Sequence, residues 1–454
     1  MRIRNDCSNM CSPFLRTVWR RLESSPICHR LARGAFWSIL AVIVSRGAGL
    51  FASIPIARIL GKEGFGEYGI IYSTVVMFSS LVGSGLNMTS SKYVAEYRAT
   101  NPGRAGRIIA QSNLFSIGIS MSLACSLLAM SSWLATHALS APHLAPLIAL
   151  SSAALFFNIL TQVQNGTLSG LEAFHSIADR NCWSGLVRFV SAVIGVWYWG
   201  LHGAVAAMIL TEAVVLVLNE LAIRRECRNY GIRVVFSRRL TDGPILFRFS
   251  IPAAMTGALM GPITWLCHAI LVNRPNGMSE MGLYAAAIQW KSLILLIPFA
   301  LNSVILPMLS NLFGSGDAET FKKVLLLNVA FYGISAGALA LLISILSPII
   351  LDFYGDQFPA GSIVLVLVAF SSVFFAIQEL LTRAMASQEA MWQSFSFQLA
   401  SGVCLLGLTS LFTNRGWGAA GLAAASIIAS FVGVAGQAWW LRRHYHAREG
   451  SRCM

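Results

Sequence analysis

The chain has 454 residues, of which 56% are hydrophobic and 11% are charged, and its formal net charge at pH 7 is +14. A mean hydropathy of +0.66 over this length exceeds what the core of a soluble protein uses. The composition therefore excludes a soluble globular protein and predicts an all-α integral membrane protein.

The first 33 residues form an arginine-rich segment that precedes a long apolar stretch. This stretch is too long for the core of a signal peptide and lacks a clear cleavage site, so it predicts a retained membrane span. Further apolar stretches of about 20 residues follow, each long enough to cross a hydrocarbon core of about 30 Å. Twelve transmembrane helices are predicted, at residues 34–57, 69–91, 108–131, 144–167, 181–199, 203–223, 244–272, 283–311, 324–346, 360–382, 391–412 and 418–441.

Lysine and arginine gather in the connections on one side of these spans. They cluster in residues 1–33, after the second, sixth and eighth spans, and in the tail 442–454. The loops on the other side hold only Arg58, Lys62, Arg274 and Arg415. Because cytoplasmic loops retain positive charge, both termini are predicted to lie in the cytoplasm. The net charge then reflects topology and contact with membrane lipids, and it calls for no nucleic-acid partner.

The nine cysteines all fall at cytoplasmic or intramembrane positions of this topology. No cysteine or histidine cluster has the spacing of a metal site, so no metal is predicted, and His268, alone in an apolar span, is interpreted as an ordinary buried residue. The nearest string to a phosphate-binding loop, Gly61-Lys62, is followed by Glu63 instead of the serine or threonine of such a loop, so the chain is not predicted to use ATP. External connections are too short to house a catalytic domain. The sequence thus predicts a protein that is not an enzyme and has no cofactor.

The chain matches itself at an offset of about 216 residues. Gly66-Glu67-Tyr68 corresponds to Gly282-Leu283-Tyr284, and Asn87 corresponds to Asn302 in nearly the same register. An even number of spans in each repeat gives the two halves the same orientation, with a pseudo-twofold axis along the membrane normal. This parallel repeat predicts two six-helix lobes: an N-lobe at 34–223, a cytoplasmic linker at 224–243, a C-lobe at 244–441 and the tail 442–454.

The residues around the first two spans form a recognisable pattern: Gly34, Trp37, Arg46, then Ala57-Arg58-Ile59-Leu60-Gly61, Gly66-Glu67-Tyr68-Gly69, Gly85 and Lys92-Tyr93. Tyr284-Ala285-Ala286, Pro298-Phe299-Ala300 and Pro307 extend it into the second half. The pattern resembles the polysaccharide exporters of the MOP superfamily, which include the O-antigen flippases of the Wzx type.

This resemblance implies two MATE-like lobes arranged as a V in the bacterial inner membrane. It implies a flippase that moves an undecaprenyl-diphosphate-linked oligosaccharide, an O-antigen or exopolysaccharide repeat unit, from the cytoplasmic to the outer leaflet by alternating access. The implied partners are this polyprenyl-diphosphate-linked glycan, membrane lipids, and a polysaccharide polymerase with its chain-length protein. The transporter itself is expected to act as a monomer.

Three cations, Arg46, Arg188 and Lys291, lie in the middle of predicted spans. Each costs roughly 2.5–3.5 kcal/mol at the centre of a bilayer, so a helix that keeps one generally supplies a partner or a water-filled cavity. Arg offers planar bidentate donors and Lys a point charge, and together they suit the pyrophosphate of a lipid-linked substrate. The alternative is a private ion pair for each cation, and Arg188 has a candidate partner in Glu212 at comparable depth.

Glu212 has two interpretations. It either pairs permanently with Arg188, or it titrates in the low-dielectric interior and couples proton movement to transport. Glu379 is a second candidate for ion coupling, although its spacing to Arg383 favours an i,i+4 pair near the end of a helix.

Asn158, Gln162 and Asn165 share one face of the fourth predicted span. Such a polar stripe either hydrogen bonds to sugars and water in the cavity of a lobe or packs between helices. Asn87 and Asn302, which correspond in the repeat, are expected to act in the same way from the two halves.

Two other functions remain as alternatives. A MATE-like exporter of small molecules or cations would need acidic residues facing the cavity, whereas the first span offers Arg46 and no carboxylate. A membrane glycosyltransferase or polysaccharide ligase would need a large external loop. The longest such loops, near 132–143 and 347–359, carry only His137, His143, Asp352 and Asp356 as candidate groups.

Overall fold

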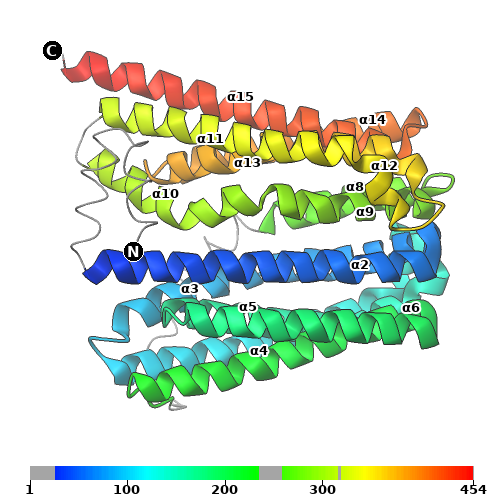
Figure 1. The fold of residues 1–454 in the computed structure, drawn as a ribbon, viewed down its shortest axis with the longest axis horizontal. Coiled ribbons are helices and arrows are strands. Elements are labelled where there is room, and N and C mark those ends of the chain that lie inside the picture. Colours follow the sequence, from blue (N-terminus) through cyan, green and yellow to red (C-terminus); the bar gives the residue numbers. More distant parts are fainter. Residues whose placement is uncertain (1–25, 235–257, 315–317, 453–454) are drawn as a thin grey trace, which may run out of the picture.

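The computed structural model describes residues 26–234, 258–314 and 318–452, and this part of the chain contains helices and no strand (Figure 1). The helices are α2 (Pro26–Ser80), α3 (Gly83–Tyr97), α4 (Pro102–Trp133), η2 (Leu134–Ala138), η3 (Pro142–Leu144), α5 (Ala145–Gly170), α6 (Phe174–Asn229), α8 (Met260–Val272), α9 (Gly277–Ile294), α10 (Leu296–Gly314), α11 (Ala318–Ile345), α12 (Ser347–Asp352), η4 (Pro359–Gly361), α13 (Ser362–Ala386), α14 (Met391–Asn414) and α15 (Gly418–Arg452). Parts of the predicted N-terminal segment (1–25), linker (235–243), seventh span (244–257) and tail (453–454) lie outside the described residues.

The two longest helices each contain a break at a glycine. Gly61 in α2 has φ 69° and ψ 179°, and Gly200 in α6 has φ 55° and ψ −131°. Residues other than glycine rarely adopt these positive φ values, so the sequence permits a sharp change of direction there. We refer to residues 26–60 and 62–80 as the first and second arms of α2, and to 174–199 and 201–229 as those of α6. These breaks fall in the gaps between predicted spans.

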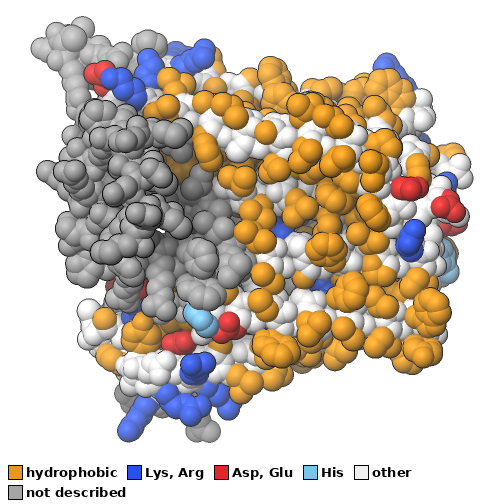
Figure 2. All heavy atoms as spheres, in the orientation of Figure 1, with side chains coloured by type: hydrophobic (Ala, Val, Ile, Leu, Met, Phe, Trp, Pro, Cys, Tyr) orange, Lys and Arg blue, Asp and Glu red, His pale blue; other side chains and the backbone are white. Residues whose placement is uncertain are grey.

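Among the described residues, seven helices are long and apolar enough to cross a membrane, or eight if the 50° bend between 46–80 and 85–97 lies within one span. Apolar side chains cover the middle of the face seen in Figure 2, and charged side chains lie mainly toward its two ends. This distribution is expected of a protein whose centre lies in hydrocarbon. The all-helical membrane architecture is confirmed, and the count of twelve spans stays a prediction.

The start of α2 and the end of α15 lie at the same end of the helix bundle, at the left in Figure 1. We call this the terminal end and the opposite one the far end. Helices α2 to α6 pack mainly on one another, as do α8 to α15. The main contacts between these two groups, here called the first and second halves, are those of α2 with α8, α9 and α10.

The contact between α2 and α9 follows the sequence repeat. A Cβ atom on Gly66 would overlap the carbonyl oxygen of Met278, and a Cβ atom on Gly282 would overlap that of Lys62. Lys62 and Gly66 correspond to Met278 and Gly282 in the repeat, so the two approaches are reciprocal. Backbone therefore packs directly on backbone at a pseudo-twofold contact, which we call the glycine contact.

Further contacts join the halves toward the far end. Phe65 of α2 packs against Tyr354 and Phe358, with ring centroids 6.3 and 6.2 Å away. The Asn273 side chain donates to the Ala138 carbonyl at 2.7 Å. Phe65 and both of its aromatic partners are at least 99% buried. The halves are therefore closed against each other at the far end.

Candidate functional site

A pocket of about 80 Å³, partly open to its surroundings, lies between both arms of α2, both arms of α6 and helix α9. Its wall combines small side chains with polar and aromatic ones: Gly49, Ala52, Ser53, Ile56, Tyr68, Tyr72, Arg188, Ala192, Ala204, Ala207, Met208, Thr211, Glu212 and Gln289. Small residues in α2 and α6 leave the space that the polar groups share. The pocket therefore brings together elements from both halves of the chain.

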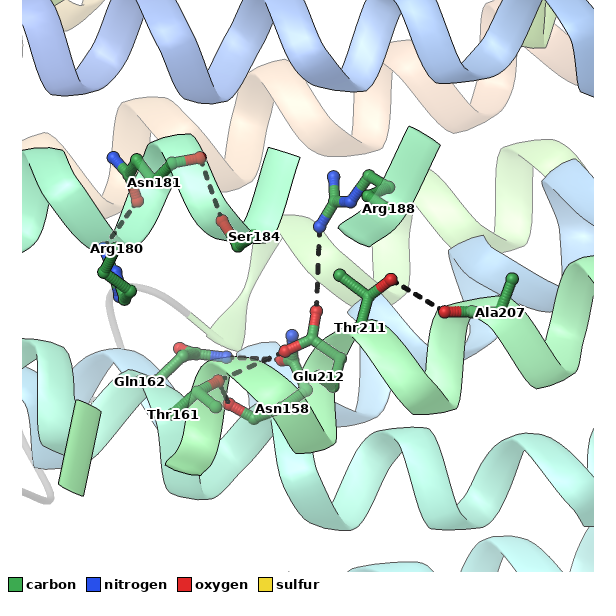
Figure 3. A network of polar contacts seen from close by, with 10 residues as sticks. All are labelled: Asn158, Thr161, Gln162, Arg180, Asn181, Ser184, Arg188, Ala207, Thr211 and Glu212. Carbon is green, nitrogen blue, oxygen red and sulfur yellow. Dashed lines mark hydrogen bonds and ion pairs between the residues drawn. The ribbon is translucent and has the colours of Figure 1, made fainter. Parts of the chain in front are cut away.

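Arg188 and Glu212 face each other from the two arms of α6 (Figure 3). Nη2 of Arg188 lies 3.9 Å from Oε1 of Glu212, at the outer limit of an ion pair, and Thr161 donates to Oε2 of Glu212 at 3.3 Å. The Arg188 side chain is 43% exposed and the Glu212 side chain 15%. The predicted pairing is thus present but loose, and Arg188 retains donors that are not committed to Glu212.

Arg46 of α2 contacts the residue next to Lys291 across the two halves. Nη1 of Arg46 donates to Oγ of Ser292 at 3.2 Å, and Ser292 is the residue after Lys291 in α9. The Lys291 ammonium lies 4.3 Å from the centre of the Phe375 ring in α13. Neither cation forms an ion pair with a carboxylate in the described part of the chain. Two positive charges therefore lie within one stretch of the contact between α2 and α9.

Arg188 is near the same stretch. A Cβ atom on Gly49 would lie 3.7 Å from Nη1 of Arg188. Gly49 is three residues after Arg46 in the first arm of α2. On the facing helix, Gln289 of the pocket is two residues before Lys291. The three cations that the sequence singled out are thus distributed around one region at the boundary of the two halves. Such a region attracts an anion with more than one negative charge.

Glu379 lies in α13, away from this pocket. Its Oε2 is 3.8 Å from Nη2 of Arg383, and the two side chains are about one-third exposed. The predicted i,i+4 pair is therefore present, and its role in ion coupling stays a prediction.

The predicted polar stripe of α5 makes contacts between and along helices. The Gln162 side chain donates to the Asn158 side chain at 2.9 Å, and the Gln162 backbone carbonyl accepts from the Asn87 side chain at 2.7 Å. Asn165 accepts from Arg180 of α6. Among the described pocket residues, none belongs to this stripe. The side chain of Asn302, in α10, lies outside the described part of the structure.

Arg180 is a buried cation that the sequence-based reasoning missed. It is 9% exposed, and its guanidinium donates to the amide oxygens of Asn165, of Asn219 at 3.1 Å and of Asn181 at 2.7 Å. Three asparagines on α5 and both arms of α6 thus solvate one guanidinium (Figure 3 shows Arg180 with Asn181). The sequence signal was an arginine and three asparagines near the same end of neighbouring helices.

Replacing Arg180 by alanine is expected to destabilise the first half by about 1–3 kcal/mol, because it leaves buried amide oxygens without donors. The measurement is the midpoint of thermal unfolding of the purified protein in detergent. Arg224→Ala is the matched control, since its ion pair with Glu220 is on the surface, with the Arg224 side chain 67% exposed, and should shift stability by less than about 1 kcal/mol. Equal midpoints for the two variants would contradict a structural role for Arg180.

Tyr68 and Tyr72 were also missed. They are one helical turn apart in the second arm of α2, their rings are stacked with centroids 6.5 Å apart, and both line the pocket. Tyr72 is 45% exposed, so one aromatic ring faces the open space. The i,i+4 spacing of the two tyrosines was visible in the sequence, but only the fold shows that they lie opposite Arg188 and Glu212.

Comparison with known proteins assigns the chain to a class. The sequence profile of the family described as "Polysaccharide biosynthesis protein" matches residues 31–313. The EPS I polysaccharide export inner membrane protein EpsE of Ralstonia nicotianae is 20% identical over 391 residues, which cover 84% of this chain and 86% of that protein. The succinoglycan biosynthesis transport protein ExoT of Rhizobium meliloti is 28% identical over 264 residues, covering 58% of this chain and 50% of ExoT.

Two solved structures resemble the fold. A multidrug resistance MATE family transporter of the MOP superfamily, in an inward-facing conformation, aligns with a TM-score of 0.75 at 14% identity, covering 92% of this chain and 99% of that one. A MOP superfamily transporter from Pyrococcus furiosus aligns with a TM-score of 0.69 at 14% identity, covering 94% and 97%. The predicted resemblance to the MOP superfamily is confirmed, and the fold is that of these transporters.

Proposed function

Because the chain belongs to the polysaccharide biosynthesis protein family, we propose that it is a flippase for a lipid-linked oligosaccharide. In this proposal the substrate is a repeat unit on undecaprenyl diphosphate, carried from the cytoplasmic to the outer leaflet of the bacterial inner membrane. The two halves, six helices in each, alternate between access from one side and from the other. Both termini lie in the cytoplasm, so the terminal end is cytoplasmic and the far end is external.

The observation that carries the proposal is the arrangement of the three cations. Arg46 bonds across the halves to Ser292, the residue next to Lys291, and neither cation has a carboxylate partner among the described residues; Arg188 is only loosely paired. A pyrophosphate has the charge and the acceptor oxygens to bind such a set. A site at the boundary of the halves also suits alternating access, because both halves can hold the headgroup while they move.

The pocket supports binding of the attached sugar as well. Tyr72 offers an exposed ring, and Thr211, Gln289 and Glu212 offer hydrogen-bonding groups within the same space. Asn87, Asn158, Gln162, Asn165 and Asn302 remain proposed as further polar contacts that a change of conformation would release to the cavity. Apolar pockets with a few placed polar groups are the usual form of small-molecule sites.

Reconstitution tests this function directly. The purified protein is placed in liposomes with a fluorescent undecaprenyl-diphosphate-linked oligosaccharide, and a membrane-impermeant quencher reports how much label has changed leaflet. We expect label on the inner leaflet to become accessible only in liposomes with protein, whereas undecaprenyl phosphate without pyrophosphate and glycan should move poorly. Movement of neither lipid would contradict the proposal.

A MATE-like cation exporter is the competing function, because MATE transporters share the fold. Its test uses the same liposomes with a fluorescent organic cation inside and a proton or sodium gradient. Export of the cation together with no movement of the lipid-linked glycan would favour the competing function. The shortage of carboxylates at the described pocket, where Glu212 is the one acidic side chain, favours the flippase.

Glu212→Gln is expected to change how transport depends on the proton gradient. The carboxylate lies in the interior beside Arg188, so binding and release of a proton there would alternately free and hold this arginine. We expect glycan movement by the variant to persist but to lose its acceleration by a proton gradient. The measurement is the rate in liposomes with and without an imposed gradient. An unchanged dependence on the gradient would exclude Glu212 as the coupling residue.

A further inference from the structure

His268 is a buried histidine of α8 at the contact between the two halves. It is 6% exposed, and its Nδ1 lies 2.7 Å from Oγ of Ser73 in the second arm of α2. Its ring meets Tyr284 of α9 edge to face, with centroids 5.5 Å apart. Three residues earlier in α8, Trp265 donates to Thr74 of α2 at 2.9 Å. His268 is therefore part of the closed boundary rather than of one half alone.

The second ring nitrogen of His268 has no hydrogen-bond partner among the described residues. Nε2 is buried and forms no hydrogen bond in the described part of the structure. A neutral imidazole leaves one polar atom unpaired at such a place, at a cost of about 1–3 kcal/mol. An imidazolium has two N–H donors, and its second donor would be buried with a full charge and no acceptor. The closed contact thus accommodates the neutral ring far better than the protonated one.

The groups close to the ring on α8 and α9 do not compensate a positive charge. Cys267, on the same helix, and Tyr284 are titratable groups that are neutral at physiological pH. Glu280 is one turn before Tyr284, but its Oε2 accepts from the backbone N–H of Ala419 at 2.7 Å. A protonated His268 therefore finds no free carboxylate on these helices.

The other described helices packed against α8 hold no carboxylate near the His268 ring either. Helix α14 contains no charged residue, and the residues of α15 before Arg442 are uncharged. The second arm of α2 carries Lys62, Glu63 and Glu67, all near its start, and Glu67 pairs with His143 at 2.6 Å. A protonated ring can therefore be stabilised only if the halves separate and water reaches it.

We propose that His268 is a proton-binding site that opens the far-end contact between the two halves. The inference rests on the proposed function insofar as alternating access requires this contact to open. A ligand that binds one conformation better shifts the population toward it, and here the ligand is a proton and the favoured state is open. An imidazole in water titrates near pH 6.5, so below that pH the ratio of open to closed protein rises by up to about tenfold per pH unit.

The test measures the far-end distance against pH. An unnatural keto amino acid replaces Ser132 in the first half and Arg415 in the second, both of which are exposed at the far end. A spin label is attached to each keto group, so the native cysteines are not labelled. Pulsed electron paramagnetic resonance in lipid nanodiscs is recorded from pH 8.5 to pH 5. The protein with native His268 should gain a long-distance population as the pH falls. His268→Gln, which is always neutral and can still bond to Ser73, should stay closed throughout.

His143→Gln is the matched control, because His143 is exposed at the same end and pairs only within the first half. It should leave the pH response intact. Should His268→Gln fold poorly, Ser73→Ala serves instead: it weakens the closed state and should move the opening to higher pH. A far-end distance that ignores pH, or a response that survives His268→Gln, overturns the proposal. Neither outcome concerns the substrate, so the flippase assay stands or fails separately.

Discussion

Replacing Arg46 by alanine is expected to reduce polysaccharide export at least tenfold while the protein remains inserted in the membrane. The guanidinium reaches across the boundary of the halves to Ser292 and has no carboxylate partner among the described residues. A hydrogen bond to a charged group contributes about 1.5–3 kcal/mol, so losing it should lower transport roughly 10- to 100-fold. The measurement is surface polysaccharide in a cell that depends on this gene, with the protein quantified in isolated membranes.

Two further variants separate charge from geometry at this position. Arg46→Lys should restore transport in part, because lysine keeps the positive charge but not the planar pair of donors. Lys291→Ala should resemble Arg46→Ala, since both cations would bind the same pyrophosphate. Arg415→Ala, at an exposed site of the far end, should leave export unchanged. Normal transport by both Arg46→Ala and Lys291→Ala would place the headgroup site elsewhere.

The sequence was sufficient to predict the class of protein and much of its organisation. Apolar stretches and their charged flanks predicted the helices, because both report directly on the cost of placing a residue in hydrocarbon. The repeat predicted that Gly66 and Gly282 are equivalent, and the glycine contact is reciprocal at these two residues. The pairing of Arg188 with Glu212 followed from their similar depth alone.

The features that the sequence could not predict depend on which helices become neighbours. Arg180 directly precedes the predicted span 181–199 and was not singled out, but the packing of α5 on both arms of α6 surrounds it with asparagines. His268 looked ordinary, because only the contact of α8 with α2 leaves its Nε2 unpaired. Hydrophobic periodicity reports the buried face of a helix and not the identity of the helix that covers it.

Gly282→Ala is expected to lower transport by at least tenfold, through a change of conformation and not through the site. A Cβ atom there would overlap the Lys62 carbonyl, which belongs to a backbone that cannot rotate away as a side chain does. Forcing an extra carbon into such a contact typically costs about 1–3 kcal/mol. This cost destabilises only the conformation in which the far end is closed. The far-end distance measured by spin labels should therefore increase at every pH. Transport slows because the cycle must pass through the closed state.

The reciprocal geometry makes this prediction specific. Gly66→Ala places its Cβ atom on the Met278 carbonyl, so it should have the same effect from the other half. Gly118→Ala is the matched control: no described atom beyond the surrounding helix backbone lies within 4 Å of the added carbon, and alanine in an open helical position should stabilise α4 slightly, by up to about 1 kcal/mol. If Gly66→Ala and Gly282→Ala export polysaccharide as well as Gly118→Ala, tight closure at the glycine contact is not part of the transport cycle. If only one of these two variants loses transport, the halves do not close symmetrically. The position of that variant then identifies the half whose backbone cannot move aside.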